Sequence, residues 1–282
     1  MKCYKLVIVA IVCSSVSTVE AVTVTQFAAA PALNVWGESL LVGTSTISIE
    51  DLTGLGGDLE NNQPAPIGAA LLTTGFDNSY RAEVAIGTAY DASTLMNTGL
   101  LGYSYYKETV AGGNTSAAPT LKLGVFAAAG NTGDNFGQLI YEPNWNQPGG
   151  GSQNPPADAW QNVAIDSSTG DGVTTTGGWW WSGGLGEPSG VGGPPIRSLG
   201  EWAALFDAAD SVGFATAQIV GVSVGVGTFN QGQVGYFDNV SIAIPGGTSV
   251  TYDFEPIPEP STFVLCGLGL ALITVNRRRR RG

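Results

Sequence analysis

The chain has 282 residues, with 11 lysines and arginines against 23 aspartates and glutamates, and it contains no histidine. The lack of histidine excludes Ser-His-Asp hydrolases, histidine zinc sites and histidine-ligated haem. A formal net charge of −12 repels the phosphates of nucleic acid at long range, so we expect no nucleic-acid partner.

The first 21 residues have the pattern of a secretory signal peptide. Two lysines precede an apolar run over 6–12, and small residues lead up to Ala21. We therefore predict a signal peptide over 1–21, cleaved after Ala21. Two alternatives stay open: a buried N-terminal strand, and a lipoprotein signal at Cys13, although the valine before Cys13 is bulkier than the residue usual there.

Most of the basic residues lie at the two ends of the chain. The segment between them, with its linker, keeps four: Arg81, Lys107, Lys122 and Arg197. It keeps 21 of the 23 acidic residues, because only Glu20 and Glu259 lie outside it, so its net charge is −17. All three cysteines also lie outside it, which excludes a disulfide or a thiolate nucleophile there.

Residues 22–254 predict one large all-β domain. Strand-like segments recur between breaks rich in glycine, proline and asparagine. They cover residues 68–74, 81–87, 100–109, 120–128, 138–143, 159–165, 219–227, 234–244 and 249–254. Several alternate between apolar and polar residues, which is typical of antiparallel sheets with one buried face, so we expect an antiparallel β-sandwich.

One helix is predicted from Ser198. Ser198 and Glu201 have the spacing of a capping box, and Trp202, Leu205 and Phe206 fall on one helical face. Four long polar loops, over 54–66, 130–137, 144–156 and 181–195, interrupt the strands. Loops of this length in a compact domain are either functional or mobile.

Two strand sequences resemble the late strands of jelly-roll modules. They are AWQNVAI over 159–165 and GYFDNVSIAI over 235–244. Jelly-roll modules occur among carbohydrate-binding and lectin-like domains, so the resemblance implies a jelly-roll-like sandwich. It does not identify a ligand.

Three consecutive tryptophans, Trp179, Trp180 and Trp181, are candidates for stacking on a sugar ring. Neighbouring residues of a strand face opposite sides, so at most two of them share a face. An indole ring fits the apolar face of a sugar. The alternatives are that the three rings close the end of the core, or that they form a partner interface.

Two acidic turns are candidates for binding Ca²⁺. Asp134 lies in NTGDNFG, and Asp238 is followed by Asn239. Ca²⁺ prefers six to eight oxygen ligands, which loops supply from carboxylates and carbonyls. The alternative is an Asx-turn at Asp134 and a strand-end hydrogen bond at Asp238.

A glycoside hydrolase needs two carboxylates on either side of the scissile bond. Glu83 and Glu142 lie in strand-like segments that could face a cleft, but no E-x-D-x-x-E strand motif is present. We therefore expect a protein that is not an enzyme.

The C-terminus has three consecutive parts. A linker over 255–260 contains Pro258, Glu259 and Pro260, and an apolar segment over 261–276 follows it. At 1.5 Å per residue, a helix of about 18 residues spans roughly 27 Å, just enough for a membrane. The arginines of the tail over 277–282 favour the cytoplasmic side and stop transfer: Arg277, Arg278, Arg279, Arg280 and Arg281.

This order of Pro-Glu-Pro, apolar helix and arginine cluster resembles the PEP-CTERM sorting signal of Gram-negative bacteria. The resemblance implies export and anchoring in the inner membrane. It also implies recognition of Pro258, Glu259 and Pro260 by an exosortase, a membrane transpeptidase. The mature protein is then expected at the cell surface or in an exopolysaccharide matrix.

Three hypotheses for the body follow from these patterns. The first is an interaction module that binds extracellular polysaccharide, with Ca²⁺ as the one cofactor considered. The second is a structural or adhesive coat protein without a sugar site. The third is a secreted glycoside hydrolase.

Overall fold

The computed structural model describes residues 19–129, 135–170, 177–190, 193–227, 229–247 and 249–257. Residues 1–18 of the predicted signal peptide, Asp134, the Pro258–Pro260 motif, the apolar segment and the arginine tail all lie outside these ranges. Within them, no helix has the length and apolar character needed to cross a membrane.

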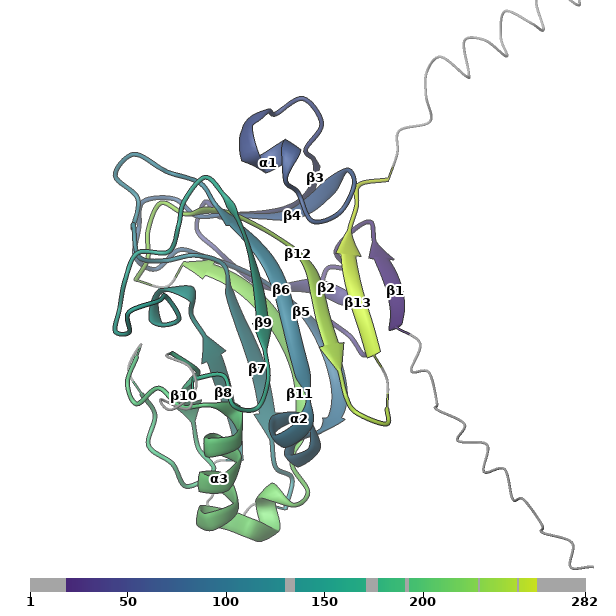
Figure 1. Cartoon of the computed structure of the whole chain (residues 1–282), viewed down its shortest axis with the longest axis vertical. Coiled ribbons are helices and arrows are strands. Elements are labelled where there is room, and N and C mark those ends of the chain that lie inside the picture. The colour runs from purple at the N-terminus through teal and green to yellow at the C-terminus, as the bar shows by residue number, and fades with distance from the viewer. Residues whose placement is uncertain are drawn as a thin grey trace, which may run out of the picture.

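The body consists of two β-sheets (Figure 1). The seven-stranded sheet contains β1 (Val19–Val24), β3 (Thr46–Asp51), β4 (Gly68–Thr73), β6 (Leu100–Lys107), β9 (Trp160–Ile165), β12 (Val234–Ala243) and β13 (Ser249–Phe254). The six-stranded sheet has the order β10 (Trp180–Gly183), β8 (Phe136–Tyr141), β7 (Thr120–Phe126), β11 (Gln218–Gly227), β5 (Arg81–Asp91) and β2 (Trp36–Val42). The predicted antiparallel character holds for every strand pair except β1 and β13, which are parallel.

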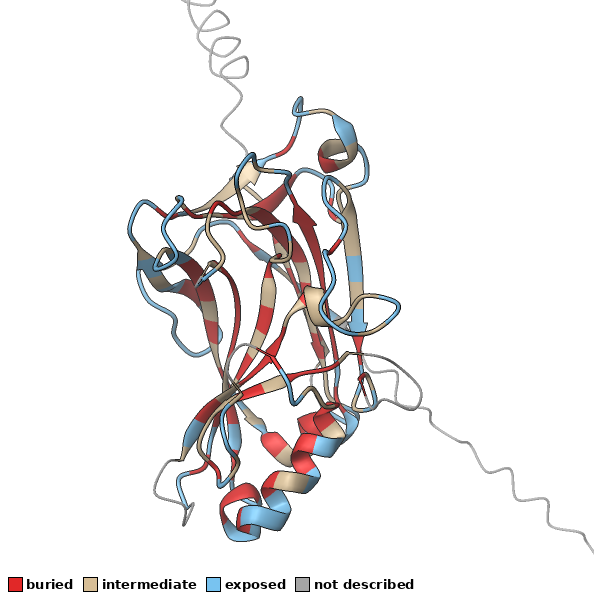
Figure 2. Ribbon diagram, turned by 90° about the vertical axis from the view of Figure 1, so that its left-hand side faces the viewer, coloured by how far each residue is buried: buried red, intermediate tan, exposed pale blue. Residues whose placement is uncertain are grey.

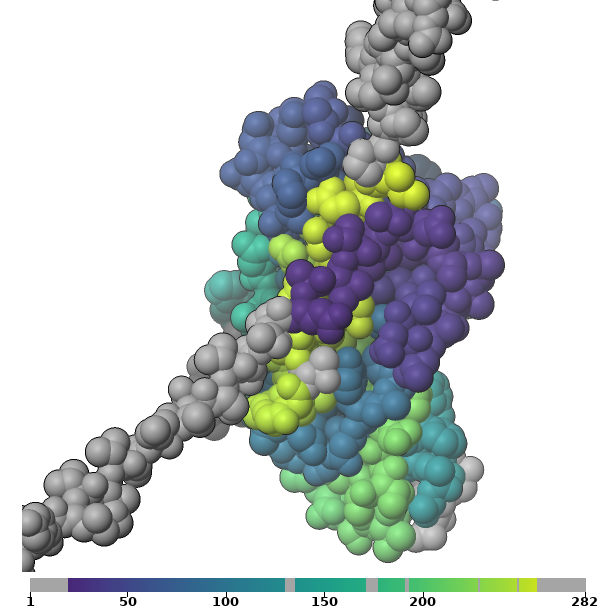
Figure 3. Space-filling model, turned by 90° about the vertical axis from the view of Figure 1, so that its right-hand side faces the viewer, coloured from purple at the N-terminus to yellow at the C-terminus, as the bar shows by residue number. Residues whose placement is uncertain are grey.

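The parallel pair brings the two ends of the described chain together. β1 lies along β13, with Val19 opposite Ser249 and Val24 opposite Phe254. Figure 3 shows the corresponding purple and yellow segments side by side on one face of the molecule. β1 spans the cleavage point predicted after Ala21, and that boundary stays a prediction.

The core lies between the sheets, as the buried residues in Figure 2 show. On β7, Leu121, Leu123 and Val125 face inward, while Lys122 and Gly124 face outward, as the alternation predicts. Burial of these apolar side chains is the main favourable term in folding, at roughly 25 cal/mol per Å² removed from water.

Aromatic rings fill the part of the core between β2 and the C-terminal strands. The ring centroids of Trp36 and Phe254 lie 5.2 Å apart, and those of Phe237 and Phe254 lie 4.9 Å apart. Both pairs meet edge to face, the arrangement that the ring quadrupoles favour.

Four helical segments complete the fold: α1 (Gly57–Asn61), α2 (Ala92–Thr98), the 3₁₀ turn η1 (Pro143–Trp145) and α3 (Leu199–Phe214). α2 and α3 contact each other at one end of the sandwich, while α1 lies at the other end (Figure 1). The predicted capping box of α3 is present. The Glu201 backbone N–H donates to the Ser198 hydroxyl, and the Ser198 N–H donates to the Glu201 carboxylate at 2.8 Å.

β12 is the branch point of the seven-stranded sheet. One of its edges pairs with β6, while the other edge pairs first with β4 over 234–237 and then with β13 over 240–243. Asp238 and Asn239 lie at the point where the partner changes, and Asn239 has a positive φ of 51°. Asp238 is therefore placed beside the end of β13.

Candidate functional site

The outer face of the six-stranded sheet carries one continuous row of side chains. The strand register aligns Trp180 of β10 with Ile140, Lys122, Ser223 and Ala85 on the next four strands. The residues after Ile140 lead into η1, so the Trp180 end of this row lies close to the loop over 144–156.

The three consecutive tryptophans divide between the core and this outer face. Trp179 and Trp181 are fully buried, and the Trp181 ring packs 4.7 Å from Phe206 of α3. Stacking on a sugar needs an open ring face, which neither Trp179 nor Trp181 offers, so the expectation is wrong for these two. Trp180 faces outward and is half-buried.

Trp180 is held in place by Glu142, the residue directly after β8. The Trp180 indole N–H donates to the Glu142 carboxylate at 3.1 Å. Burial raises the pKa of Glu142, against the opposing effects of the Trp180 N–H, the charge of Lys122 and the Trp145 N–H. The effect of Trp145 is the smallest of these, and its buried indole N–H makes no full hydrogen bond with any of the described residues.

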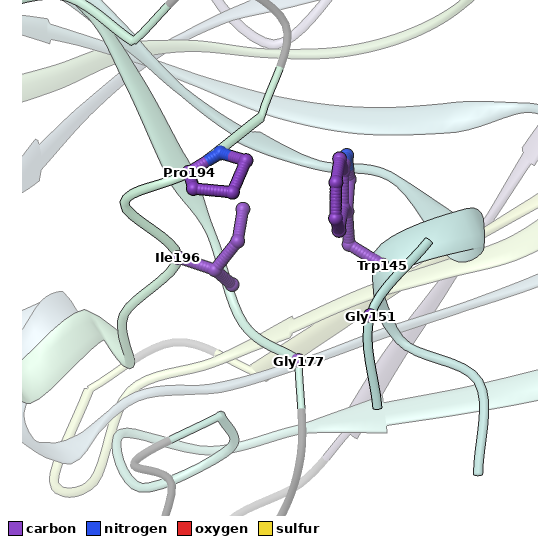
Figure 4. A pocket seen from close by; sticks show the side chains of 5 residues that line it. All are labelled: Trp145, Gly151, Gly177, Pro194 and Ile196. Carbon is purple, nitrogen blue, oxygen red and sulfur yellow. The ribbon is translucent and has the colours of Figure 1, made fainter. Parts of the chain in front are cut away.

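Next to Glu142, Trp145 forms one wall of an open slot of about 260 Å³. In Figure 4 the flat face of the Trp145 indole lies opposite Pro194 and Ile196. Gly151 and Gly177 complete the lining. The lining is almost entirely apolar.

The slot depends on glycine and on one asparagine. A Cβ at Gly193 would lie 2.8 Å from the Trp145 ring, so no larger residue fits there without moving the indole. The Asn146 side chain accepts from the Gly178 N–H at 2.6 Å and donates to the Glu142 carbonyl at 2.8 Å. These bonds tie η1 to the chain that leads into β10, so Trp145, Glu142 and Trp180 form one unit.

Glu83 and Glu142, the two carboxylates considered for hydrolysis, both belong to this outer face. Glu83 on β5 forms an ion pair with Lys122 on β7, reaching across β11. The pair lies over Gly225, where an added Cβ would come within 3.1 Å of the Glu83 carboxylate. Glu83 is thus bound to Lys122 rather than directed at the slot.

Asp238 lies on the other sheet and is fully buried. Its Oδ1 accepts from the Phe254 N–H at 2.9 Å, which is the strand-end hydrogen bond considered as the alternative to Ca²⁺. Burial raises its pKa to about 7, and the charges of Asp253 and Glu255 act in the same direction. Within the described ranges, no group of three or more carboxylate, histidine or cysteine side chains is placed to hold a metal ion, and Ca²⁺ at Asp238 stays a prediction.

Sequence reasoning selected the loops over 144–156 and 181–195 but not the residues that form the slot. Trp145, Asn146 and Pro194 lie within those loops, and Ile196 directly follows the second one. The signal available in the sequence was a tryptophan inside a polar loop, since such a ring needs a packing partner or a ligand.

Comparison with known proteins identifies the C-terminus and the general type of fold. Residues 256–281 match the PEP-CTERM protein-sorting motif, as the Pro-Glu-Pro, apolar and arginine segments predict. No curated protein matches the chain in sequence.

Several solved structures are similar in fold. A family 11 carbohydrate-binding module from Clostridium thermocellum, in complex with a β-1,3-1,4-mixed-linked tetrasaccharide, is 9% identical with a TM-score of 0.38, and covers 80% of this chain and 92% of its own. TmCBM61, in complex with β-1,4-galactotriose, is 11% identical with a TM-score of 0.31, and covers 74% and 88%. An exo-β-agarase is 12% identical with a TM-score of 0.35, and covers 74% of this chain but 23% of its own. The chain therefore carries a PEP-CTERM protein-sorting motif that follows its two-sheet β body in the sequence.

Proposed function

We propose that this protein is an exported, non-catalytic carbohydrate-binding module, and that the Trp145 slot together with Trp180 forms its binding site. The observation that carries the proposal is the open face of the Trp145 indole opposite Pro194 and Ile196. Ligand sites are concave and mostly apolar, with a few placed polar groups. The slot supplies apolar walls for the C–H face of a sugar ring.

The fixed geometry of the site supports binding rather than movement. Asn146 joins both sides of the site, and Glu142 holds the Trp180 ring by its N–H. A site that is already ordered loses less conformational entropy when a ligand binds. The same geometry disfavours glycoside hydrolysis, because the Glu83 carboxylate is engaged in an ion pair with Lys122.

Isothermal titration of the purified protein against a panel of soluble polysaccharides tests the proposal. We expect saturable binding that falls at least about tenfold in Trp145→Ala, because a central aromatic contact carries much of the binding free energy. Phe76→Ala is the matched control, since Phe76 is an aromatic residue that is 59% exposed and lies outside the slot. Undiminished binding by Trp145→Ala, or no binding to any polysaccharide, would overturn the proposal and favour a coat protein.

The sorting motif supports a second part of the proposal. An exosortase would recognise Pro258, Glu259 and Pro260 while the segment over 261–276 anchors the chain in the inner membrane, and the body would then reach the cell surface or an exopolysaccharide matrix. Replacing Arg277–Arg281 by serine is expected to leave the protein misoriented or mislocalised, as measured by protease accessibility of the body in whole cells. Unchanged surface display would count against this part alone.

A further inference from the structure

Three of the four basic residues of the body have partners within the fold, and none of the four lines the slot. Lys122 is paired with Glu83, and the Lys107 ammonium donates to the Thr115 carbonyl. The Arg197 guanidinium lies 4.9 Å from the centre of the Trp202 ring, in a cation–π contact. The fourth, Arg81, begins β5, three strands away from β8 in the six-stranded sheet.

A carboxylate, by contrast, borders the slot. Glu142 receives the Trp180 N–H, and its backbone carbonyl receives the Asn146 amide. Glu142 therefore stands between the two rings of the proposed site, Trp145 and Trp180. The body around the site has a net charge of −17 with its linker, from four basic and 21 acidic residues.

This arrangement of charges disfavours the binding of a negatively charged ligand. Recognition of a uronate needs a cation or several N–H donors directed at the carboxylate, and Arg is the usual residue for it. Here the lining of the slot contains no basic residue, and the adjoining Glu142 carboxylate has the same sign as the ligand. Like charges across a binding interface lower the affinity.

We infer that the Trp145 slot binds an uncharged sugar ring and rejects uronate-containing polysaccharides. The inference rests on the proposed function and adds the chemical class of the ligand. The slot volume of about 260 Å³ lies below the roughly 300–1,000 Å³ of pockets that enclose drug-sized molecules. One ring therefore enters the slot, and the rest of the chain lies across the surface at Trp180.

Two pairs of soluble polymers test the inference, because each pair shares a backbone and differs in charge. The pairs are hydroxyethyl cellulose with carboxymethyl cellulose, and methyl-esterified with free polygalacturonate. We expect titration calorimetry of the purified protein to give about tenfold or more weaker binding of the charged member at low ionic strength. The difference should shrink at high salt, because screening weakens repulsion between exposed charges.

Glu142→Gln tests which residue causes the rejection. Glutamine keeps the size of the side chain and an oxygen that accepts the Trp180 N–H, but it removes the charge. We expect the ratio of the affinities for the neutral and the charged polymer to fall about fivefold in this variant. Glu38→Gln is the matched control, because it removes the same charge from an exposed position on β2, the opposite edge strand of the same sheet, and should leave this affinity ratio unchanged.

The outcomes separate the inference from the proposed function. Equal or tighter binding of the charged polymers at low salt would overturn the inference and leave carbohydrate binding in place. An equal fall of this affinity ratio in Glu38→Gln and Glu142→Gln would overturn the role of Glu142, because the effect would then come from net charge alone. Lack of binding by either pair, and by every polysaccharide in the panel, would overturn the proposed function itself. Thermal melts of both variants report whether each keeps its fold.

Discussion

The two outer faces of the sandwich carry similar aromatic residues, but they differ in whether the protein's own chain covers them. On the seven-stranded sheet, Trp160, Tyr106 and Tyr236 lie side by side on three neighbouring strands, with ring centroids 5.7 Å and 5.9 Å apart. On the six-stranded sheet, the outward-facing Trp180 is hydrogen-bonded to Glu142, three residues before the slot-lining Trp145. Each face thus has an aromatic surface.

Only the first of these surfaces is covered by the protein's own chain. Leu52 and Leu59, at and near α1, pack against Tyr106 and Tyr236. The Trp160 indole N–H donates to the Leu59 carbonyl at 3.0 Å, and the Trp160 backbone N–H donates to Asp58 at 2.6 Å. The covered rings therefore have their packing and hydrogen-bond partners within the fold, whereas the Trp145 ring lines the slot.

This difference separates the aromatic residues with a structural role from those of the proposed binding site. An aromatic residue on the outside of a sheet does not by itself indicate a ligand, because a loop of the same chain can cover it. What distinguishes the Trp145 slot is a ring face that lines a surface hollow, with Pro194 and Ile196 opposite it. Mutations on the two faces are thus expected to affect different quantities, stability on the covered face and affinity on the open one.

The largest effect is expected from Asp238, which lies on the covered side two residues after Tyr236. Its pKa is raised from 3.8 to about 7, so the folded state binds a proton more tightly than the unfolded state does. Its contribution to stability is therefore complete below about pH 4 and is lost as the pH rises through 7, which amounts to about 4 kcal/mol for three pKa units.

Asp238→Asn keeps an oxygen for the Phe254 N–H but cannot ionise. We expect the difference in free energy of unfolding between the variant and the natural protein to grow in favour of the variant from pH 4 to pH 8, as measured by urea denaturation. The difference isolates Asp238 from the other acids. A constant difference over this range would contradict the raised pKa.

The same pair of proteins tests the Ca²⁺ prediction for Asp238. If Ca²⁺ bound there, millimolar Ca²⁺ would raise the melting temperature of the natural protein at pH 8, EDTA would reverse the increase, and Asp238→Asn would not respond. Melting temperatures unaffected by Ca²⁺ and EDTA would leave Asp238 as the strand-end residue that the Phe254 hydrogen bond indicates.

The next effect is expected from Trp160→Ala, which removes a ring from the covered surface. The loss of its packing on Tyr106 and of two hydrogen bonds should lower the free energy of unfolding by about 3 kcal/mol. Carbohydrate affinity, measured by titration calorimetry on the folded fraction, should stay within about twofold. An affinity loss comparable to that of Trp145→Ala would remove the distinction between the two faces.

The sequence predicted the strands better than the site. Nine predicted segments coincide with β4, β5, β6, β7, β8, β9, β11, β12 and β13. Their period-two alternation reports directly which side chains face the core. β10 has only four residues and is defined as a strand by its pairing with β8. No local sequence pattern therefore distinguishes it from a loop.

The three consecutive tryptophans show what the alternation of strand residues can and cannot predict. The rule that at most two of three consecutive residues share a face was correct, since Trp179 and Trp181 face inward and Trp180 outward. The sequence did not indicate which face was the core. Trp145 and Ile196 are separated by 50 residues and meet through loops, whose conformation depends on tertiary contacts such as those of Asn146.

The smallest effect is expected from Trp180→Phe, which separates the ring of Trp180 from its hydrogen bond. Phenylalanine keeps an aromatic face on the outer surface but cannot donate to Glu142, so the pKa of Glu142 should rise further above its usual value. The ring also loses its fixed orientation, because the bond at 3.1 Å is what holds the indole over β8. We expect affinity for a neutral polysaccharide to fall only about threefold, the effect of losing one hydrogen bond of about 0.7 kcal/mol. Titration calorimetry at two pH values measures both consequences. Trp180→Ala should lower the affinity more than Trp180→Phe does, because it also removes the stacking surface. Equal losses of affinity in the two variants would mean that Trp180 contributes through its orientation by Glu142 and not through its ring face.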